Sequence, residues 1–393
     1  MKYLNQHLQS AINIIQAYDG LVPMAVYLKN HFSSNKKFGS KDRRNITQFC
    51  YAYYRLGFAG KDLLPEQKIR IALFLLNNSS EGWQLLFEHS WLEVWHKSIA
   101  EKISFVEKEF PSFNIQDLFP WKTLLGKGLD QELFSHSFLI QPDLFLRLRP
   151  GKEKQTIQKL ADQQILFKQI SSSCLALPNA SKLESVLELD TEVIVQDASS
   201  QKIAELLKLV KWDVPKHIHF WDCCAASGGK TILAKDIIGE MDITVSDIRH
   251  SILHNLSHRF QRAGIHKYHP IVTDLSSDKP GLPPKKYQLI FCDVPCTGSG
   301  TWCRTPEQLS FFKESTLKDF VHLQQKILHN TIPLLANEGY FLFSTCSVFA
   351  QENEANTAFI LAENDQLEIV SEIYLKGYEQ KADTMYAVLF RKK

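Results

Sequence analysis

The sequence contains no run of about 20 apolar residues, the length that a membrane-spanning helix needs, so we expect no membrane association. Its eight cysteines include no C-x-x-C pair, which argues against a structural zinc site, and we expect no bound metal. The first twenty residues place Leu4, Leu8 and Ile15 among polar side chains at helical spacing, which is typical of an amphipathic helix and not of a secretion signal. We therefore expect a cytoplasmic protein whose thiols stay reduced.

The net charge is also small, at +2 for 393 residues, so the total does not indicate a nucleic-acid partner. The charge is unevenly spread, however, because the chain up to Cys50 has seven basic residues, from Lys2 to Arg44, and only two acidic ones. A basic N-terminal face of this kind can contact RNA phosphates. It is equally compatible with a solvated loop and helix start, and charge alone leaves both interpretations open.

Three regions of different pattern follow one another along the chain. Residues 1–135 have few strand signals, which predicts a helical domain. In residues 136–190, leucines alternate with other residues at 144–149, a helical stretch follows, and strand-like runs come after it, the first at 165–170. This pattern predicts a small α+β module. Strands and helices alternate regularly from 191 to 393, which indicates an α/β fold with a doubly wound, mainly parallel sheet.

Five short strands are expected in this last region, and an acid or a cysteine follows each of them. These residues are Asp222, Asp247, Asp274, Asp293 and Cys346. In open α/β sheets, ligands bind beyond the carboxyl ends of the strands, so we expect the five side chains to share one rim. A single Asp after a strand is usually only a turn former, but a series at one rim indicates a binding site.

The turn after the first of these strands reads Cys224, Ala225, Ala226, Ser227, Gly228, Gly229 and Lys230, and all of these except the lysine are small. Small side chains let the backbone approach a ligand closely. The end of this turn is similar to a P-loop, but Cys224 stands where that motif needs glycine, and G-x-G-x-x-G is also absent. Asp247, at the end of the next strand, can accept hydrogen bonds from ribose hydroxyls. A nucleoside cofactor without a diphosphate fits this set, and S-adenosylmethionine is one.

Two cysteines, Cys296 and Cys346, follow successive strands in glycine-rich and polar settings. Two thiols beside a sulfonium cofactor suggest covalent catalysis. Carbon 5 of cytosine is a poor nucleophile, but addition of a thiolate to carbon 6 makes carbon 5 enamine-like, so that it can accept a methyl group. The alternative is a purely structural role, in which Cys296 and Cys346 fill space in the core. We favour that structural role for Cys50, Cys223 and Cys292.

Four segments in this order and spacing resemble the RsmB/Sun (Fmu) family of RNA cytosine-5 methyltransferases. They are VQDASSQ (195–201), CAASGGKT (224–231), DVPCTGSGT (293–301) and STCS (344–347), the last followed by Glu352-Asn353-Glu354. The resemblance spans residues 191 to about 360, and the combination of segments is highly specific. It implies a Rossmann-like methyltransferase domain that uses S-adenosylmethionine.

The resemblance also implies a role for each matched position. Cys346 would attack carbon 6, Cys296 would help to release the RNA adduct, and the turn from Cys224 to Lys230 would hold the methionine part of the cofactor. Ser227 stands where the family usually has proline, from which we expect a less rigid turn but not a loss of binding.

The acids on the rim receive roles from the same resemblance. Asp247 would hold the ribose, Asp274 would lie beside the adenine, and Asp293 would contact the cofactor or the cytosine edge. After the Gly300 loop, many members carry paired arginines, of which Arg304 alone is present, and Trp302 is expected to pack or to stack on a base.

The other two regions resemble the family more weakly. Residues 136–190 are similar in position to an RNA-recognition-motif-like subdomain, and residues 1–135 are similar to a NusB-like RNA-binding domain. Ribosomal RNA is therefore the favoured substrate and transfer RNA the runner-up, for an enzyme that we expect to be a monomer. Two alternatives stay open: a non-catalytic RNA-binding assembly factor with a relict methyltransferase fold, and a methyltransferase for small molecules or proteins.

Overall fold

A computed structural model describes residues 3–211 and 218–393, so Lys2 of the basic N-terminal set lies outside the described residues. The chain divides into two compact units. We call Met1–Thr123, Asp130–Gln141 and Trp302–Lys313 the helical unit, and Leu124–Leu129, Pro142–Thr301 and Glu314–Lys393 the sheet unit. The predicted domains 1–135, 136–190 and 191–393 are continuous segments, whereas these units interleave along the chain.

The helical unit contains α1 (Leu4–Ala17), α2 (Met24–Ser34), α3 (Ser40–Arg55), α4 (Pro65–Leu76), α5 (His89–Val94), α6 (Ile99–Glu109), α7 (Gln131–Ser137) and α13 (Glu307–Phe311). Local signals set several helix starts: Asp42 accepts a hydrogen bond from the Gly39 N–H before α3, and Ser98 and Glu101 cap α6 reciprocally. The helical character predicted for this region is confirmed. Its likeness to NusB stays a prediction.

The segment from Trp302 to Lys313 packs within the helical unit, although it directly follows the Gly300 loop in sequence. Trp302 is 2% exposed, and its ring lies 5.1 Å from that of Phe312 and 6.3 Å from that of Trp121. Trp302 therefore packs in an aromatic cluster, which is the first of the two roles expected for it.

The sheet unit is built on a seven-stranded sheet with the order β10-β11-β9-β8-β5-β6-β7. The strands are β5 (His219–Asp222), β6 (Asp242–Asp247), β7 (His269–Val272), β8 (Tyr287–Asp293), β9 (Leu335–Thr345), β10 (Leu367–Lys376) and β11 (Thr384–Lys392). The strands from β7 to β9 are parallel, and β11 and β10 extend the sheet in antiparallel pairing. The predicted doubly wound fold is confirmed, with the β10–β11 pair as an addition that the sequence analysis did not predict.

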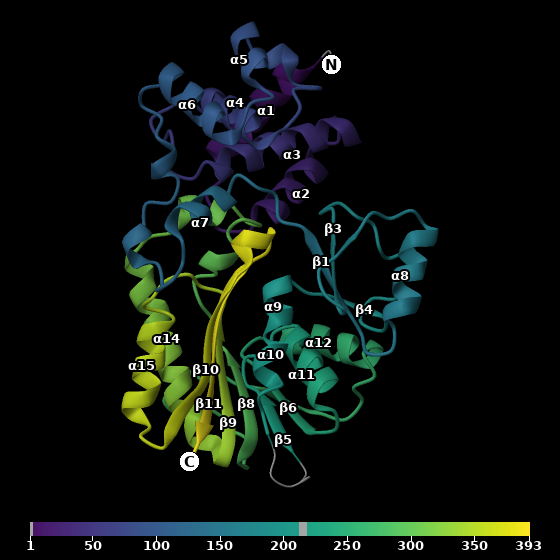
Figure 1. Ribbon diagram of the computed structural model, residues 1–393, viewed down its shortest axis with the longest axis vertical. Coiled ribbons are helices and arrows are strands. Elements are labelled where there is room, and N and C mark those ends of the chain that lie inside the picture. The colour runs from purple at the N-terminus through teal and green to yellow at the C-terminus, as the bar shows by residue number, and fades with distance from the viewer. Residues whose placement is uncertain (1–2, 212–217) are drawn as a thin grey trace. The chain divides into compact units, whose positions relative to one another are not determined.

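Helices cover both faces of this sheet (Figure 1). The helices are α9 (Ala198–Lys202), α10 (Ala204–Leu207), α11 (Gly229–Ile238) and α12 (His250–Arg262) on one side, and α14 (Ser315–Thr331) and α15 (Glu354–Glu363) on the other. Side chains from α11 and α12, such as Ile232 and Leu256, form one core with Phe220 and Phe291. A second core joins residues of α14 and α15 to the opposite side of the strands. Burial on both faces explains why these strands are short apolar runs.

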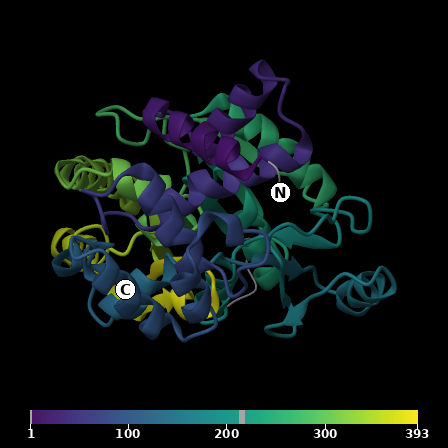
Figure 2. The same ribbon diagram turned by 90° about the horizontal axis from the view of Figure 1, so that it is seen from above.

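A smaller antiparallel sheet with the order β2-β3-β1-β4 belongs to the same unit and carries α8 (Glu153–Asp162) (Figure 1 and Figure 2). Its strands are β1 (Leu144–Leu148), β2 (Lys168–Gln169), β3 (Cys174–Leu177) and β4 (Val193–Val195). The run expected at 165–170 forms a strand of only two residues. The similarity of this module to an RNA-recognition motif stays a prediction.

Ion pairs fix the small sheet to the helices of the large one. Arg147 and Arg149 bind Asp236 of α11, and Arg259 and Arg262 of α12 bind Asp190. Among residues 3–211 and 218–393, no helix is long and apolar enough to cross a membrane.

Candidate active site

The carboxyl ends of the parallel strands surround one cavity of about 660 Å³. Seven of the predicted site residues line it: Cys224, Ala226, Asp247, Asp274, Asp293, Cys296 and Cys346. The other predicted positions, Ala225, Ser227, Gly228, Gly229 and Lys230, belong to the turn and to the start of α11. The volume lies within the range of small-molecule sites, and the parallel edge of the sheet is where such sites occur.

The turn that precedes α11 has an unusual backbone conformation. Ala226 has a φ of +46° and Gly228 a φ of +80°. A Cβ atom at Gly228 would lie 2.5 Å from the ring of Phe260. Both the positive φ and this close approach require glycine at the position. Ser227, the residue in place of the usual proline, accepts a hydrogen bond on Oγ from Arg259 Nη1 at 2.9 Å. This bond provides a tie that a proline could not make.

Asp247 lies at the end of β6, between this turn and the next helix. Its Oδ2 accepts a hydrogen bond from the Ala226 N–H at 3.2 Å, and its Oδ1 accepts one from the Arg249 N–H at 2.9 Å. The neighbouring Ile248 also lines the cavity, and it is 60% exposed. The sequence analysis did not single out Ile248.

Asp274 and Asp293 have different surroundings. The Asp274 carboxylate accepts hydrogen bonds from the N–H and the hydroxyl of Ser276, which hold the pKa of Asp274 below its ordinary value. Asp293 Oδ2 lies 2.7 Å from Lys230 Nζ, and its Oδ1 accepts a hydrogen bond from Ser344 Oγ at 2.6 Å. Burial opposes the charge on Lys230, but Asp293 outweighs it and raises the pKa of Lys230.

The sulfur atoms of Cys296 and Cys346 lie 3.3 Å apart. The hydrogen bond to Cys346 and the burial of the thiol, together with the nearby charges of Cys346 and Glu352, raise the pKa of Cys296 well above its ordinary value. Cys296 is therefore a neutral thiol near pH 7, within hydrogen-bond distance of the other sulfur. Cys223, Cys292 and Cys50 are buried, as the space-filling interpretation expects.

Comparison with known proteins supports a methyltransferase domain. Residues 211–389 match the family model described as 16S rRNA methyltransferase RsmB/F. The probable ribosomal RNA small subunit methyltransferase B of Synechocystis is 30% identical over 275 residues, which are 67% of this chain and 59% of that protein. The ribosomal RNA small subunit methyltransferase B of Yersinia enterocolitica is 26% identical over 178 residues, 45% of this chain and 40% of that protein.

The chain belongs to the RsmB/Sun family. It spans about 59% of the length of the Synechocystis relative and less of the next ones. The crystal structure of PH0851 has the same fold, with a TM-score of 0.70 at 18% identity over 98% of both chains. A methyltransferase homologue from Pyrococcus horikoshii has a TM-score of 0.58 at 18% identity, over 74% of this chain and 98% of that one. The RsmB/F match contains every predicted site residue, and S-adenosylmethionine is the cofactor of this methyltransferase family.

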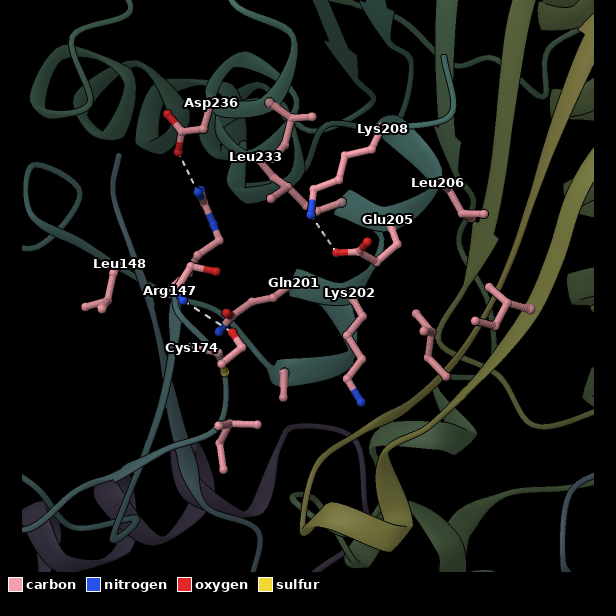
Figure 3. A pocket seen from close by; sticks show the side chains of 18 of the residues that line it. Arg147, Leu148, Cys174, Gln201, Lys202, Glu205, Leu206, Lys208, Leu233 and Asp236 are labelled. Carbon is pink, nitrogen blue, oxygen red and sulfur yellow. Dashed lines mark hydrogen bonds and ion pairs between the residues drawn. The ribbon is translucent and has the colours of Figure 1, made fainter. Parts of the chain in front are cut away.

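The sheet unit of this RsmB/Sun family member has a second cavity, of about 650 Å³ (Figure 3). The small sheet, α9, α10, α11 and β10 line it, and its side chains include the ion pairs Arg147–Asp236 and Lys208–Glu205. Within the described part of the chain, none of the predicted site residues lies on its walls. The cavity at the strand ends is therefore the candidate active site.

Proposed function

We propose that this protein transfers a methyl group from S-adenosylmethionine to carbon 5 of cytosine in RNA, with ribosomal RNA as the favoured substrate. The observation that carries the proposal is the pair of thiols, Cys296 and Cys346, whose sulfur atoms lie 3.3 Å apart at the wall of a cavity of cofactor size. A methyltransferase for small molecules or proteins has no use for two such thiols.

The residues around the cavity fit the cofactor. The cofactor supplies a methyl group on a positively charged sulfur. The turn at Ala226 and Gly228 lets backbone approach the methionine part, Asp247 can accept hydrogen bonds from the ribose hydroxyls, and the exposed side chain of Ile248 offers an apolar surface for the adenine. Asp274 lines the same cavity, and we propose that it lies beside the adenine.

In the proposed mechanism, the Cys346 thiolate adds to carbon 6 of the cytosine, and the electron pair of the 5,6 double bond moves toward carbon 5, which then accepts the methyl group. Lys230 and Asp293 form an ion pair next to this step, and Asp293 is suited to contact the cytosine edge. The proton on carbon 5 is then removed, and the electron pair left behind re-forms the double bond and expels the Cys346 sulfur.

Cys296 is suited to this last step because of its contact with Cys346. The hydrogen bond to Cys346 is the largest cause of the raised pKa of Cys296 in the free protein. Once the Cys346 sulfur is bonded to carbon 6 it is uncharged, so that this cause is removed and Cys296 loses its proton more readily. Cys296 is thus a neutral thiol before the adduct forms and a stronger candidate base after it.

The choice of RNA rests on the relatives and on the N-terminal region. The relatives named above are ribosomal RNA small subunit methyltransferases, and residues 1–135 carry the basic set and the NusB-like pattern. Transfer RNA is the alternative substrate for the same chemistry. In either case the target base must be unpaired or extruded from its helix to reach the thiols. We propose a cytoplasmic monomer, as the sequence analysis expects.

The test is a trapping assay with the Cys296→Ala variant, total RNA and S-adenosylmethionine. We expect a protein–RNA adduct that resists denaturation, and we expect it to disappear when Cys346→Ala is added. Sequencing of the trapped RNA then identifies the substrate. If the variant binds the cofactor but forms no adduct, the two-cysteine mechanism is wrong, and the assembly-factor alternative is favoured.

A further inference from the structure

Glu352 is a buried carboxylate behind the two cysteine loops, and the mechanism above does not use it. Its side chain is 0% exposed. Its Oε1 accepts hydrogen bonds from the Thr297 N–H and from Gln324 Nε2, both at 2.9 Å. Its Oε2 accepts hydrogen bonds from Thr297 Oγ1 at 2.6 Å and from Ser347 Oγ at 2.5 Å. Both oxygens thus have two donors, and all four donors are uncharged, so the site is built for a carboxylate.

Two of the residues that Glu352 binds are the immediate successors of the cysteines. Thr297 follows Cys296, and Ser347 follows Cys346, so one carboxylate joins both loops one residue away from each sulfur. The loops are further joined by Ser299, whose Oγ lies 3.1 Å from that of Ser347. Gln324, on α14, also donates to the carbonyl oxygen of Pro295, directly before Cys296.

We propose that Glu352 is a positioning residue that holds the two cysteine loops together and keeps negative charge on the Cys296 side of the thiol pair. This inference rests on the proposed function for its catalytic meaning, but the arrangement of the loops can be measured without RNA. It adds a reason for the distinct roles of two chemically identical side chains.

The electrostatic surroundings of Cys296 support this assignment. The groups that act on Cys296 are Cys346, Glu352 and the Gly298 N–H, and Glu352 is one of those that raise its pKa. Removing the negative charge of Glu352 should therefore lower the pKa of the Cys296 thiol. Each unit of change in pKa is a tenfold change in the thiolate fraction at a pH below that value.

The first measurement is site-resolved alkylation of the full chain by iodoacetamide at pH 8, with Cys296 and Cys346 quantified separately by mass spectrometry. We expect Glu352→Gln to raise the alkylation rate of Cys296 relative to that of Cys346, because removing the nearby carboxylate charge favours the Cys296 thiolate. The control is Glu354→Gln, which makes the same change two residues away, at a carboxylate that binds Lys127 N–H and Tyr374 OH. We expect it to leave the ratio unchanged.

The second measurement is methyl transfer under the conditions of the trapping assay. We expect Glu352→Gln to lower kcat about 100-fold, because a displacement of reacting groups by about 1 Å has an effect of this size. The KM for RNA and the affinity for S-adenosylmethionine should change less than threefold. A lower kcat with a higher KM for RNA and a weaker affinity for S-adenosylmethionine, together with a wild-type alkylation ratio, would mean that Glu352 is only structural and would overturn the proposal.

A variant that fails to fold and a failure of the proposed function must each be told apart from a failure of the role of Glu352. If Glu352→Gln does not fold, Thr297→Val removes a single hydroxyl donor from the same carboxylate and is measured in its place, with a smaller change in the same direction expected. An unchanged alkylation ratio in every folded variant refutes the role of Glu352. If the ratio changes as expected but the wild type methylates no RNA, the proposed function fails and the role of Glu352 in the thiol pair stands.

Discussion

The ion pairs of Asp236 join the small sheet to the large one, and their loss should destabilise the sheet unit measurably. Asp236 Oδ2 lies 2.5 Å from Arg147 Nη1, and its Oδ1 lies 2.9 Å from Arg149 Nη2. The three side chains are exposed by only 6%, 5% and 14%, respectively. Asp236→Asn keeps the shape of the side chain but leaves two guanidinium groups, one of them fully enclosed, without their common counter-ion.

Removing one partner of a buried pair costs about 3–5 kcal/mol of the free energy of unfolding. The low end applies here, because asparagine keeps one acceptor oxygen and Arg149 keeps its hydrogen bonds to the carbonyl oxygens of Asp190 and Ala263. With a denaturant dependence of about 3 kcal/mol per molar, a loss of about 3 kcal/mol lowers the urea midpoint by about 1 M.

The assay is urea unfolding followed by circular dichroism, with Glu240→Gln as the control. Glu240 pairs with Lys235 on the same helix-to-strand connection, but its side chain is 98% exposed, so we expect no measurable shift. A midpoint for Asp236→Asn that equals that of the control would refute the argument.

Two further predictions concern the acids at the ends of β5 and β6. Burial raises the pKa of Asp222 to about 7, so its contribution to stability is present below about pH 4 and is lost as the pH rises through 7. Asp222→Asn should therefore raise the melting temperature more at pH 8 than at pH 5, while the exposed Asp319→Asn has the same small effect at both; equal shifts for Asp222→Asn would contradict this. Asp247→Ala should weaken the binding of S-adenosylmethionine about 10- to 100-fold in a calorimetric titration, because it removes a hydrogen bond to a charged group. Asp278→Ala is the control. An unchanged affinity in Asp247→Ala would remove Asp247 from the proposed site.

The centre of the parallel sheet was predictable because its strands β5 and β8 are buried on both faces. Each is a short apolar run that ends at a polar residue, as with Trp221 and Asp222 or Phe291 and Asp293. In the antiparallel pair β10–β11, only β10 departs from this pattern, because β11 is itself a buried apolar run that the sequence analysis did not single out. In β10, Glu368, Ile369 and Val370 are all exposed, so the strand lacks the alternation that marks a half-buried one.

The interleaving of the two units could not be predicted from local pattern. The segment after Gly300 has the composition of an ordinary loop, and what holds it in the helical unit is the contact of Trp302 with rings about 180 residues earlier in the sequence, such as that of Trp121. Likewise, Ile248 is one apolar residue among many in the sequence, and its exposure to the cavity appears only once β6 and the turn at Ala226 are in place.

The residues of the site could be identified from the sequence more completely than their relations to one another. The two cysteines are both preceded by strands and followed by small polar residues, so sequence pattern alone makes them equivalent. Their surroundings in the fold are not equivalent: Cys346 is among the charges that raise the pKa of Lys230, after Asp293, whereas Cys296 is affected by Glu352. A thiolate is disfavoured next to a carboxylate, so Glu352 opposes ionisation of Cys296. The role of Cys296 as the neutral partner of the pair therefore has an electrostatic argument that does not depend on the family resemblance.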